Sequence, residues 1–422
     1  MNHASTMNDD KQALLDQVDK DRDMLIEFLC RFIRAKSPNP PGDTREAAAH
    51  VTAFLDARGL EYRIIEAHPE MPNIVAAYDC GSPGKHLVLN GHMDVFPVNE
   101  NETWTQPPWS GAIADGKIWG RGAADMKCGT TASIFTYAYL HGLRDKLKGK
   151  LTLTCVSDEE TFGPYGARYL MEHHPEVHGD TLLNGEPGSP YTVRFGEKGP
   201  LWLKFTIRTR GAHGAYTHIS ESATKIAAKF IGELERVTDV DSKTPGNIEA
   251  VLAHSAEFID KAQGAGAAEI LQRVTLNTGV IKGGLKVNMV PSECTIEADI
   301  RLPVGITKDQ VMAEIDQALA AFPQVSMEEI NYNPPSWCDP EGEMLHIVRD
   351  NVTVLKGFTP EPIVSLGGTD ARLWRYRDIP AYVYGPFPNG MGSFDEHVDI
   401  EEFLHIVRIH ALSAYDYLAR DR

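Results

Sequence analysis

Five acidic or imidazole side chains in the first half of the chain stand beside turn signals, and their types suit metal binding. They are His92, Asp125, the adjacent Glu159 and Glu160, and Glu186. A hydrophobic, β-branched run precedes His92 (HLVLN), Glu159 (KLTLTCVS) and Glu186 (TLLN). Buried strands that end in turns project their last side chains from the carboxyl edge of a sheet, where ligands bind in open α/β folds. We therefore expect these side chains to meet at one edge.

Gathered carboxylates repel one another unless a cation lies between them. Each motif alone has an ordinary explanation, since HxD is common, an acidic pair before a turn is usually solvated, and GEPG is a simple turn. Asp125 also fits the N-cap of a helix expected from about Met126. The occurrence of all the motifs, each at a strand exit or a helix entry, favours a site for two divalent metal ions.

The elements expected around these residues alternate in type. Apolar spacing predicts helices over residues 8–35 and 44–59, separated by the loop SPNPPG (37–42). Strands and helices then alternate to about residue 195. This pattern predicts an α/β domain with a mostly parallel sheet and helices on both faces.

The pattern changes near Gly199. The elements expected beyond it are strands at 201–210, 273–281, 293–302 and QVSMEEINY, and helices at 221–236 and 307–321, with a long Gly- and Ala-rich connection over 241–268. This strand–helix–strand–strand–helix–strand order predicts a self-contained, ferredoxin-like α+β unit. Because the alternation resumes after 334–343, residues 199–336 are expected to be inserted into a catalytic domain formed by 1–198 and 337–422.

Composition excludes several classes of function. The formal net charge of −18 argues against nucleic acid or an anionic membrane as partner. The polar start MNHASTMNDDKQ predicts no signal peptide, and no uncharged apolar stretch is long enough to span a bilayer. Six scattered cysteines without a CxxC pair favour free thiols in a reducing compartment. We expect a cytoplasmic protein that acts on a small-molecule substrate.

Seven stretches run through most of the chain in the order of a known family: GHMDVFPV (91–98), WGRGAADMK (119–127), SDEETFGPYGARYL (157–170), NGEPG (184–188), RGAHGAYTH (210–218), VNMVPSECTIEADIRLP (287–303) and GGTDARLW (367–374). On these stretches the chain resembles the M20 metallopeptidases and deacylases, which include acetylornithine deacetylase, succinyl-diaminopimelate desuccinylase, aminoacylase and glutamate carboxypeptidase. The resemblance is specific to the family but not to a substrate. It implies a catalytic α/β domain with an inserted lid through which two copies dimerise.

The resemblance implies the metal ligands. Asp125 would bridge the two ions, and the peptide bond that follows it would be cis. His92 and Glu186 would ligate one ion, and Glu160 the other.

The resemblance also implies the residues that act beside the ions. Glu159 would be the general base, which takes a proton from the attacking water and later delivers one to the leaving amine. Asp94 would accept the second N–H of His92 and fix its tautomer, although a turn cap is its ordinary explanation.

The chain departs from the family pattern at the last ligand. The family has a ligand histidine four residues before a glutamate, but here Gly392 stands four residues before Glu396. We expect His397 to complete the second ion's shell; the alternatives are a surface histidine and an ion without its imidazole. Cys128 replaces a family glycine, and we expect it to be a small buried residue rather than an activated thiol.

The inserted unit would supply substrate contacts. His213 matches a histidine that reaches across the dimer to stabilise the tetrahedral oxyanion. Asn288 and Arg301 match positions that contact the oxyanion or the substrate carboxylate, although Arg301 also fits a structural ion pair within the unit. Backbone amides around Gly368 would bind the substrate's anionic end.

We therefore expect a metal-dependent hydrolase that cleaves the amide bond of a small N-acyl amino acid or dipeptide with a free carboxylate. Two divalent ions, most simply zinc, would be its cofactors, and cobalt or manganese also suits these ligands. Two alternatives stay open: an exopeptidase that acts on peptides, and a catalytically silent relative that binds only. A homodimer is expected because His213 would act in the partner's site.

Overall fold

The computed structural model describes residues 7–99, 101–241 and 243–420 and divides the chain into two compact units. The first comprises Met1–Phe195, Cys338–Ile363 and Thr369–Arg422, and the second comprises Gly196–Trp337 and Val364–Gly368. The polar start, where the sequence predicts no signal peptide, lies partly outside the described residues. The sequence places the insertion at 199–336 and gives no sign of the short return segment 364–368.

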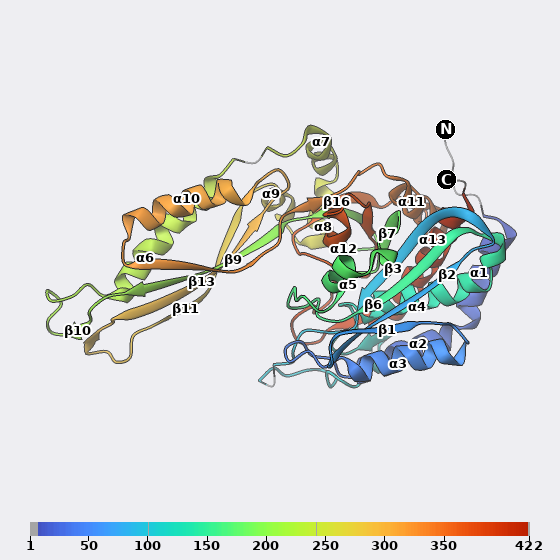
Figure 1. Ribbon diagram of the computed structural model, residues 1–422, viewed down its shortest axis with the longest axis horizontal. Coiled ribbons are helices and arrows are strands. Elements are labelled where there is room, and N and C mark those ends of the chain that lie inside the picture. The colour runs from blue at the N-terminus through green and yellow to red at the C-terminus, as the bar shows by residue number, and fades with distance from the viewer. Residues whose placement is uncertain (1–6, 100, 242, 421–422) are drawn as a thin grey trace. The chain divides into compact units, whose positions relative to one another are not determined.

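A mixed sheet forms the centre of the first unit (Figure 1). Its strands follow the order β1 (Arg63–His68), β2 (Met71–Asp79), β6 (Lys148–Val156), β3 (Ser82–His92), β7 (Thr181–Asn184), β17 (Ala381–Val383) and β8 (Thr192–Glu197). Neighbours from β6 to β17 are parallel, whereas β1, β2 and β8 pair in the antiparallel sense. The sheet is therefore less parallel than the sequence predicts. The reason for β1 and β2 is the two-residue turn between them, because parallel strands need a far longer connection.

Helices cover both faces of this sheet. On one face, α4 (Lys127–His141) and α13 (Ile400–Ala419) pack against β3 and β6. On the other, α5 (Ala167–His173) and α12 (Ala371–Arg375) share a hydrophobic core with residues of β2, β3, β6, β7 and β17. The parallel strands are thus buried on both sides, which explains their continuous apolar runs.

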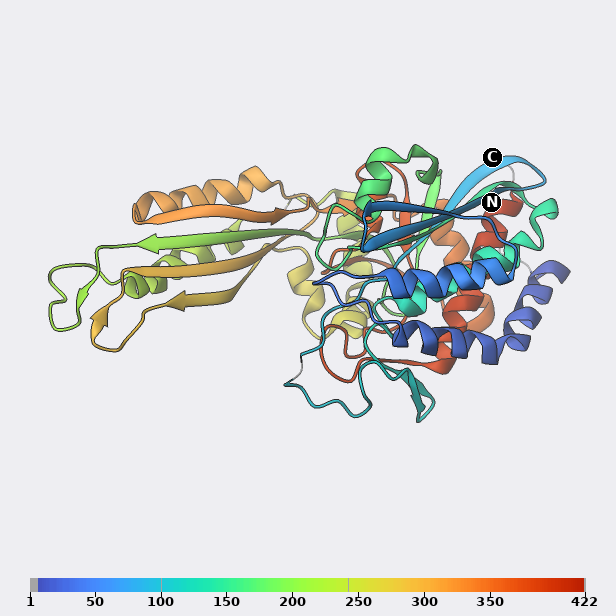
Figure 2. The same cartoon turned by 60° about the horizontal axis from the view of Figure 1, so that its bottom comes forward.

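The remaining helices of this unit are α1 (Asp9–Lys20), α2 (Arg22–Arg34), α3 (Arg45–Ala57) and α11 (Glu343–Lys356). Helices α2 and α3 lie side by side (Figure 2). The single helix predicted over 8–35 is two helices, because the backbone of Asp21, with φ −90° and ψ 9°, leaves the helical conformation.

A small antiparallel sheet of β4 (Ala112–Ala114), β5 (Lys117–Trp119) and β18 (His397–Asp399) also belongs to the first unit. In it His397 pairs with Trp119. This pairing brings a segment near the end of the chain against the loop that leads to Asp125.

The second unit has four antiparallel strands in the order β11 (Thr275–Gly283), β13 (Glu293–Leu302), β9 (Gly199–Arg208) and β14 (Val325–Tyr332). Helices α6 (Ala223–Leu234) and α10 (Lys308–Ala321) share its core with alternate residues of β9 and β13 (Figure 1). This is the ferredoxin-like arrangement expected from the element order.

The Gly- and Ala-rich connection expected over 241–268 contains three short helices that the sequence patterns do not predict. They are α7 (Gly246–His254), α8 (Ala256–Gln263) and α9 (Ala267–Leu271), preceded by a 3₁₀ turn at Glu235–Asp239. Despite the high Gly and Ala content, these helices bury four large apolar side chains: Ile248, Leu252, Ile259 and Leu271.

The other short elements are β10 (Ala212–His213), β12 (Met289–Val290), β15 (Ser336–Trp337), β16 (Glu361–Ser365), and 3₁₀ turns at Arg144–Lys146 and Pro175–Val177. None of the described helices combines the length and apolar character needed to cross a lipid bilayer.

Candidate metal centre

His92 lies at the end of β3 and is completely buried. Its Nδ1 donates to the backbone carbonyl of Asp94 at 2.8 Å, because a carbonyl oxygen can only accept. The proton is thereby placed on Nδ1, and the lone pair of Nε2 points towards Asp125 and Glu186, each 3.3 Å away. A neutral imidazole oriented in this way is the form that binds a metal ion.

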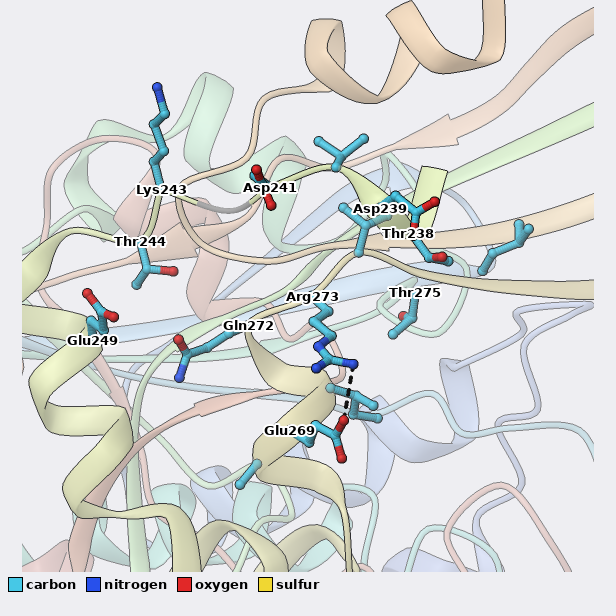
Figure 3. A pocket seen from close by; sticks show the side chains of 15 residues that line it. Thr238, Asp239, Asp241, Lys243, Thr244, Glu249, Glu269, Gln272, Arg273 and Thr275 are labelled. Atoms are coloured by element: carbon cyan, nitrogen blue, oxygen red, sulfur yellow. Dashed lines mark ion pairs between the residues drawn. The ribbon is translucent and has the colours of Figure 1, made fainter. Parts of the chain in front are cut away.

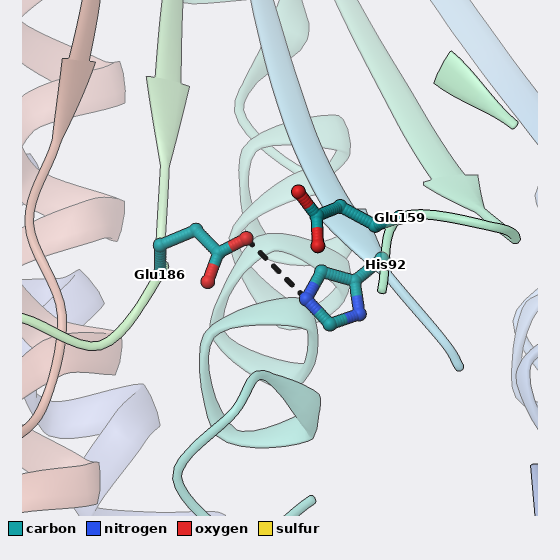
Figure 4. Close-up of side chains that lie close together, drawn as sticks. All are labelled: His92, Glu159 and Glu186. Atoms are coloured by element: carbon teal, nitrogen blue, oxygen red, sulfur yellow. Dashed lines mark ion pairs between the residues drawn. The ribbon is translucent and has the colours of Figure 1, made fainter. Parts of the chain in front are cut away.

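Four carboxylates from three separate segments surround this ring. Two groups of residues each offer ligand atoms that all lie within 4.8 Å of one another. One group is His92, Glu159 and Glu186, and the other is His92, Asp125 and Glu160. Figure 4 shows Glu159 and Glu186 directed towards the His92 ring. The five residues singled out in the sequence thus meet at the carboxyl ends of β3, β6 and β7 and at the start of α4.

The arrangement fits metal ions on two observations. His92 Nε2, Glu160 Oε1 and Glu186 Oε1 are buried without a hydrogen-bond partner among the described residues. Buried polar atoms are normally paired, and a bound cation would pair all three. A tetrahedral zinc shell with bonds of about 2.0–2.1 Å separates its ligand atoms by about 3.3 Å, and 3.3 Å is the observed separation of His92 Nε2 from both Asp125 and Glu186.

The electrostatics show the cost of leaving this cluster without cations. Burial raises the pKa of Glu186 to about 7. Burial, followed by the charge of Asp125, raises the pKa of Glu160 well above its usual value, and burial likewise raises that of Glu159. Burial lowers the pKa of His92, but Glu186 and Asp125 outweigh it and raise that pKa well above normal. The site is thus organised around positive charge.

Asp94 holds the turn that carries Glu159 and Glu160. Its Oδ1 accepts the Glu159 N–H at 3.3 Å, and its Oδ2 accepts the Glu160 N–H at 3.1 Å. The sequence predicts instead that the Asp94 carboxylate accepts from His92, but His92 Nδ1 lies 3.6 Å from it and bonds to the Asp94 carbonyl. The Asp94 side chain therefore holds the backbone of this turn rather than the His92 ring.

Asn39 completes this network, and the sequence alone did not predict its role. Its side-chain amide donates to Asp94 at 2.9 Å and to Asp158 at 3.1 Å. Asp158, with φ 65°, in turn accepts from Thr161 and from the Tyr165 N–H and closes the loop after β6. The only signal in the sequence was the Pro-rich surround of Asn39, which indicates a rigid loop but not a contact.

Arg372 is a second residue whose role the sequence left open. It is buried, and its Nη1 lies 3.2 Å from Glu159 Oε1. Its guanidinium also stacks 4.7 Å from the centre of the Phe162 ring. One oxygen of Glu159 is thus held by a cation of the protein.

Asp125 lies in the loop before α4, and its peptide bond to Met126 is cis, as the family resemblance implies. Its backbone N–H donates to the buried Glu396 carboxylate at 3.0 Å. Cys128 is fully buried, and burial raises the pKa of its thiol well above normal. This agrees with the expected small buried cysteine.

His397 is not brought to the cluster. Its ring stacks on Trp119 with 4.5 Å between centres, and its Nε2 lies 3.1 Å from Lys117 Nζ. Consecutive side chains of an extended segment point to opposite sides. Because Glu396 is directed inward, His397 is directed away, and it belongs to neither ligand group found among the described residues. Gly392, at φ 69°, has a conformation that side-chain-bearing residues rarely adopt.

The predicted residues of the second unit fall in different places. His213 and Asn288 are neighbours, because β10 pairs with β12 and the Gly214 N–H donates to the Asn288 carbonyl at 2.7 Å. Both side chains are exposed. Arg301 lies near the other end of β13 and forms an ion pair with Asp299 at 2.8 Å. Gly368 lies in the turn after β16.

The second unit also contains a hollow of about 980 Å³ between α9 and the start of β11 (Figure 3). Its charged lining residues are Asp239, Asp241, Lys243, Glu249, Glu269 and Arg273. Arg273 and Glu269 form an ion pair at 3.1 Å. Charges of both signs line the hollow, and no histidine is among the described residues around it, so it does not share the chemistry of the metal cluster.

Metal loading is predicted to stabilise the protein more at pH 8 than at pH 5.5. The ion-free folded state holds protons on Glu186 up to about pH 7, whereas the unfolded carboxyl loses them near 4.5. The ion-free protein therefore loses stability as pH rises through this window, and cations offset the loss. Calorimetry of chelated and loaded protein at both values measures the rise in Tm; an equal rise would contradict this account.

Asp94→Asn is predicted to lower activity by about 10–100-fold, the usual effect of losing a residue that orients metal ligands. The amide oxygen can replace only one of the two acceptors that hold the Glu159–Glu160 turn. Asp43→Asn is the matched control, because Asp43 is a partly exposed carboxylate that pairs with Arg45. Steady-state rates with unchanged circular dichroism test the prediction, and equal rates for both variants would reject it.

Comparison with known proteins agrees with this geometry. Residues 88–416 match the model of peptidase family M20/M25/M40. The succinyl-diaminopimelate desuccinylase of Cereibacter sphaeroides is 27% identical over 404 residues, covering 93% of this chain and 98% of that protein.

Solved structures share the fold. The M20 family metallo-carboxypeptidase of Sulfolobus solfataricus superposes with a TM-score of 0.78 at 17% identity, covering 97% of this chain and 99% of that one. A dinuclear metal binding peptidase of Bacillus subtilis has a TM-score of 0.63 at 14% identity, covering 95% and 99%. The chain described here belongs to peptidase family M20/M25/M40.

Proposed function

We propose that this enzyme is a deacylase that cleaves the amide bond of a small N-acyl amino acid bearing a free carboxylate. Membership of the family makes it a hydrolase of C–N bonds. The observation that carries the proposal is the buried cluster of His92 and four carboxylates with unpartnered ligand atoms. The named desuccinylase relative favours an acyl amino acid as substrate.

Two divalent ions would be held by His92, Asp125, Glu160 and Glu186, with Asp125 between them. When bound, they polarise the amide carbonyl and make a water molecule nucleophilic near neutral pH. Zinc is the proposed metal, and cobalt and manganese also suit one imidazole among carboxylates.

Glu159 is proposed as the general base. It lies within reach of the cluster, and Arg372 holds one of its oxygens, so that the other remains directed towards His92 and Glu186. A carboxylate fixed in this way accepts the proton of the attacking water and returns it to the leaving nitrogen. His213 and Asn288 would hold the developing oxyanion, and Arg301 and the turn at Gly368 the substrate carboxylate.

A homodimer is proposed on the exposure of the second unit's tip. Leu285 and Val287 are 91% and 100% exposed, beside the exposed His213 and Asn288. Exposed apolar side chains gathered in this way mark a surface that another protein covers. A second copy of the chain would cover them and receive His213 in its active site.

The cytoplasm is the proposed location, since all six cysteines are free thiols. An exopeptidase remains the second candidate, because a structural neighbour is a carboxypeptidase.

Glu159→Gln is predicted to lower kcat by about 10²–10⁴-fold while metal content stays the same, because the amide cannot accept a proton. Activity is measured on a panel of N-acetyl, N-succinyl and dipeptide amides with zinc, cobalt or manganese. Glu172→Gln, at an exposed glutamate, is the control. Turnover of dipeptides alone would replace the deacylase with an exopeptidase. No turnover of any amide by wild-type enzyme would establish a silent relative.

Mixing Glu159→Gln with His213→Ala is predicted to restore activity if the two residues come from different copies. Statistical exchange of two equal pools leaves about a quarter of all sites with both residues intact in a two-fold dimer. The mixture is assayed after subunit exchange, and sedimentation gives the oligomeric state. A mixture as inactive as its components, under conditions where exchange is demonstrated, would place His213 outside the partner's site.

A further inference from the structure

Glu396 is completely buried, yet it is not a member of either ligand group among the described residues. Its Oε1 accepts the backbone N–H groups of Gly122, Ala124 and Asp125 at 3.1, 2.9 and 3.0 Å. Its Oε2 accepts from Arg121 Nη1 at 2.6 Å. Four donors from one loop thus converge on one carboxylate, and its oxygens are engaged by the protein itself.

The loop has an unusual shape that brings these donors together. Gly120 and Gly122 have φ values of 146° and 88°, where glycine is favoured, and a Cβ on Gly122 would lie 2.6 Å from Val95 Cγ1. Successive N–H groups turned to one side form a concave anion site. Here the anion is a side chain, and the last of the N–H groups belongs to Asp125.

Strand pairing delivers Glu396 to this loop. β18 begins at His397 and pairs with β5, which ends at Trp119, so the residues just outside the pair face each other. The Gly120 N–H donates to the Glu396 carbonyl at 2.9 Å. Both the backbone and the side chain of Glu396 therefore hold the segment that carries Asp125.

The charge of Glu396 would normally be unfavourable beside several carboxylates. Arg121 offsets it, because this side chain is also buried and pairs directly with Glu396. The pair supplies a strong acceptor for the loop without adding net charge to the metal cluster. A neutral acceptor would avoid the charge but would bond the three N–H groups more weakly.

We propose that Glu396 is a positioning residue that fixes Asp125 between the two metal ions. The inference rests on the proposed function. The position of Asp125 matters most for the second ion, because that ion has few other ligands. Gly392 bears no side chain, and His397 is directed away. Asp125 and Glu160 are then the principal ligands of that ion, and a displaced Asp125 weakens it more than the ion held also by His92 and Glu186.

The test is a cobalt titration of wild type and Glu396→Gln, followed by the visible absorption of bound cobalt and by isothermal calorimetry. Glutamine keeps the size of the side chain, but its NH₂ group must face either Arg121 or the loop N–H groups, donor against donor. We expect the affinity for the second ion to fall about 10–100-fold, a changed cobalt spectrum, and a lower kcat with little change in KM. The first ion should bind as in wild type.

Glu402→Gln is the matched control. Glu402 is a partly buried carboxylate of α13 that accepts the Phe387 N–H, and it belongs to neither ligand group among the described residues. This variant should keep both affinities and the cobalt spectrum. If Glu396→Gln does not fold, Glu396→Asp keeps the charge but shortens the reach to the loop, and the same loss is expected.

Wild-type binding of both ions with an unchanged spectrum in Glu396→Gln, or in the aspartate variant if that is the one that folds, would overturn the inference. A wild-type protein that binds no ions would instead overturn the proposed function. The two failures are therefore distinguishable.

Discussion

Mutual repulsion among buried carboxylates is the constraint around which this molecule is organised. The ends of three neighbouring strands and the start of one helix bring Glu159, Glu160, Glu186 and Asp125 to His92, at distances that burial makes costly for like charges. Water cannot relieve the repulsion inside the fold, so either protons or metal cations must neutralise the carboxylates. The same low polarity that penalises the empty cluster would strengthen each contact between a bound ion and its ligands.

Carboxylates in and around the cluster divide into two kinds. Some expose oxygens without partners, as Glu160 and Glu186 do. Others, namely Asp94 and Glu396, accept backbone N–H groups from the segments that carry the candidate ligands. Arg121 pairs with Glu396 and Arg372 with Glu159, and these two cations limit the total negative charge. Some carboxylates of the site thus hold the backbone in place, and others offer free oxygens to a bound ion.

Local sequence patterns were sufficient for the cluster and for the ferredoxin-like unit. Apolar runs mark β3, β6 and β7, and chain order fixes which ends carry His92 and the glutamates. Features set by long-range contacts were beyond such patterns. The direction of His397 depends on which side of β18 faces the Asp125 loop. The hydrogen-bond partner of His92 Nδ1 is a backbone carbonyl, which residue types do not reveal. The helices in 241–268 were missed because their apolar residues are sparse among Gly and Ala.

The pairing of β18 with β5 also determines when, during synthesis, the Asp125 loop can reach its final conformation. Synthesis reaches Asp125 early and Glu396 only after the entire second unit, so the nascent N-terminal part lacks the carboxylate that accepts the N–H groups of the Asp125 loop. Domains fold as they emerge, but this loop stays without its acceptor until the segment beyond the second unit has been made. On the roles proposed for these residues, a chain truncated shortly before β18 would carry the candidate ligands without the carboxylate that holds the Asp125 loop.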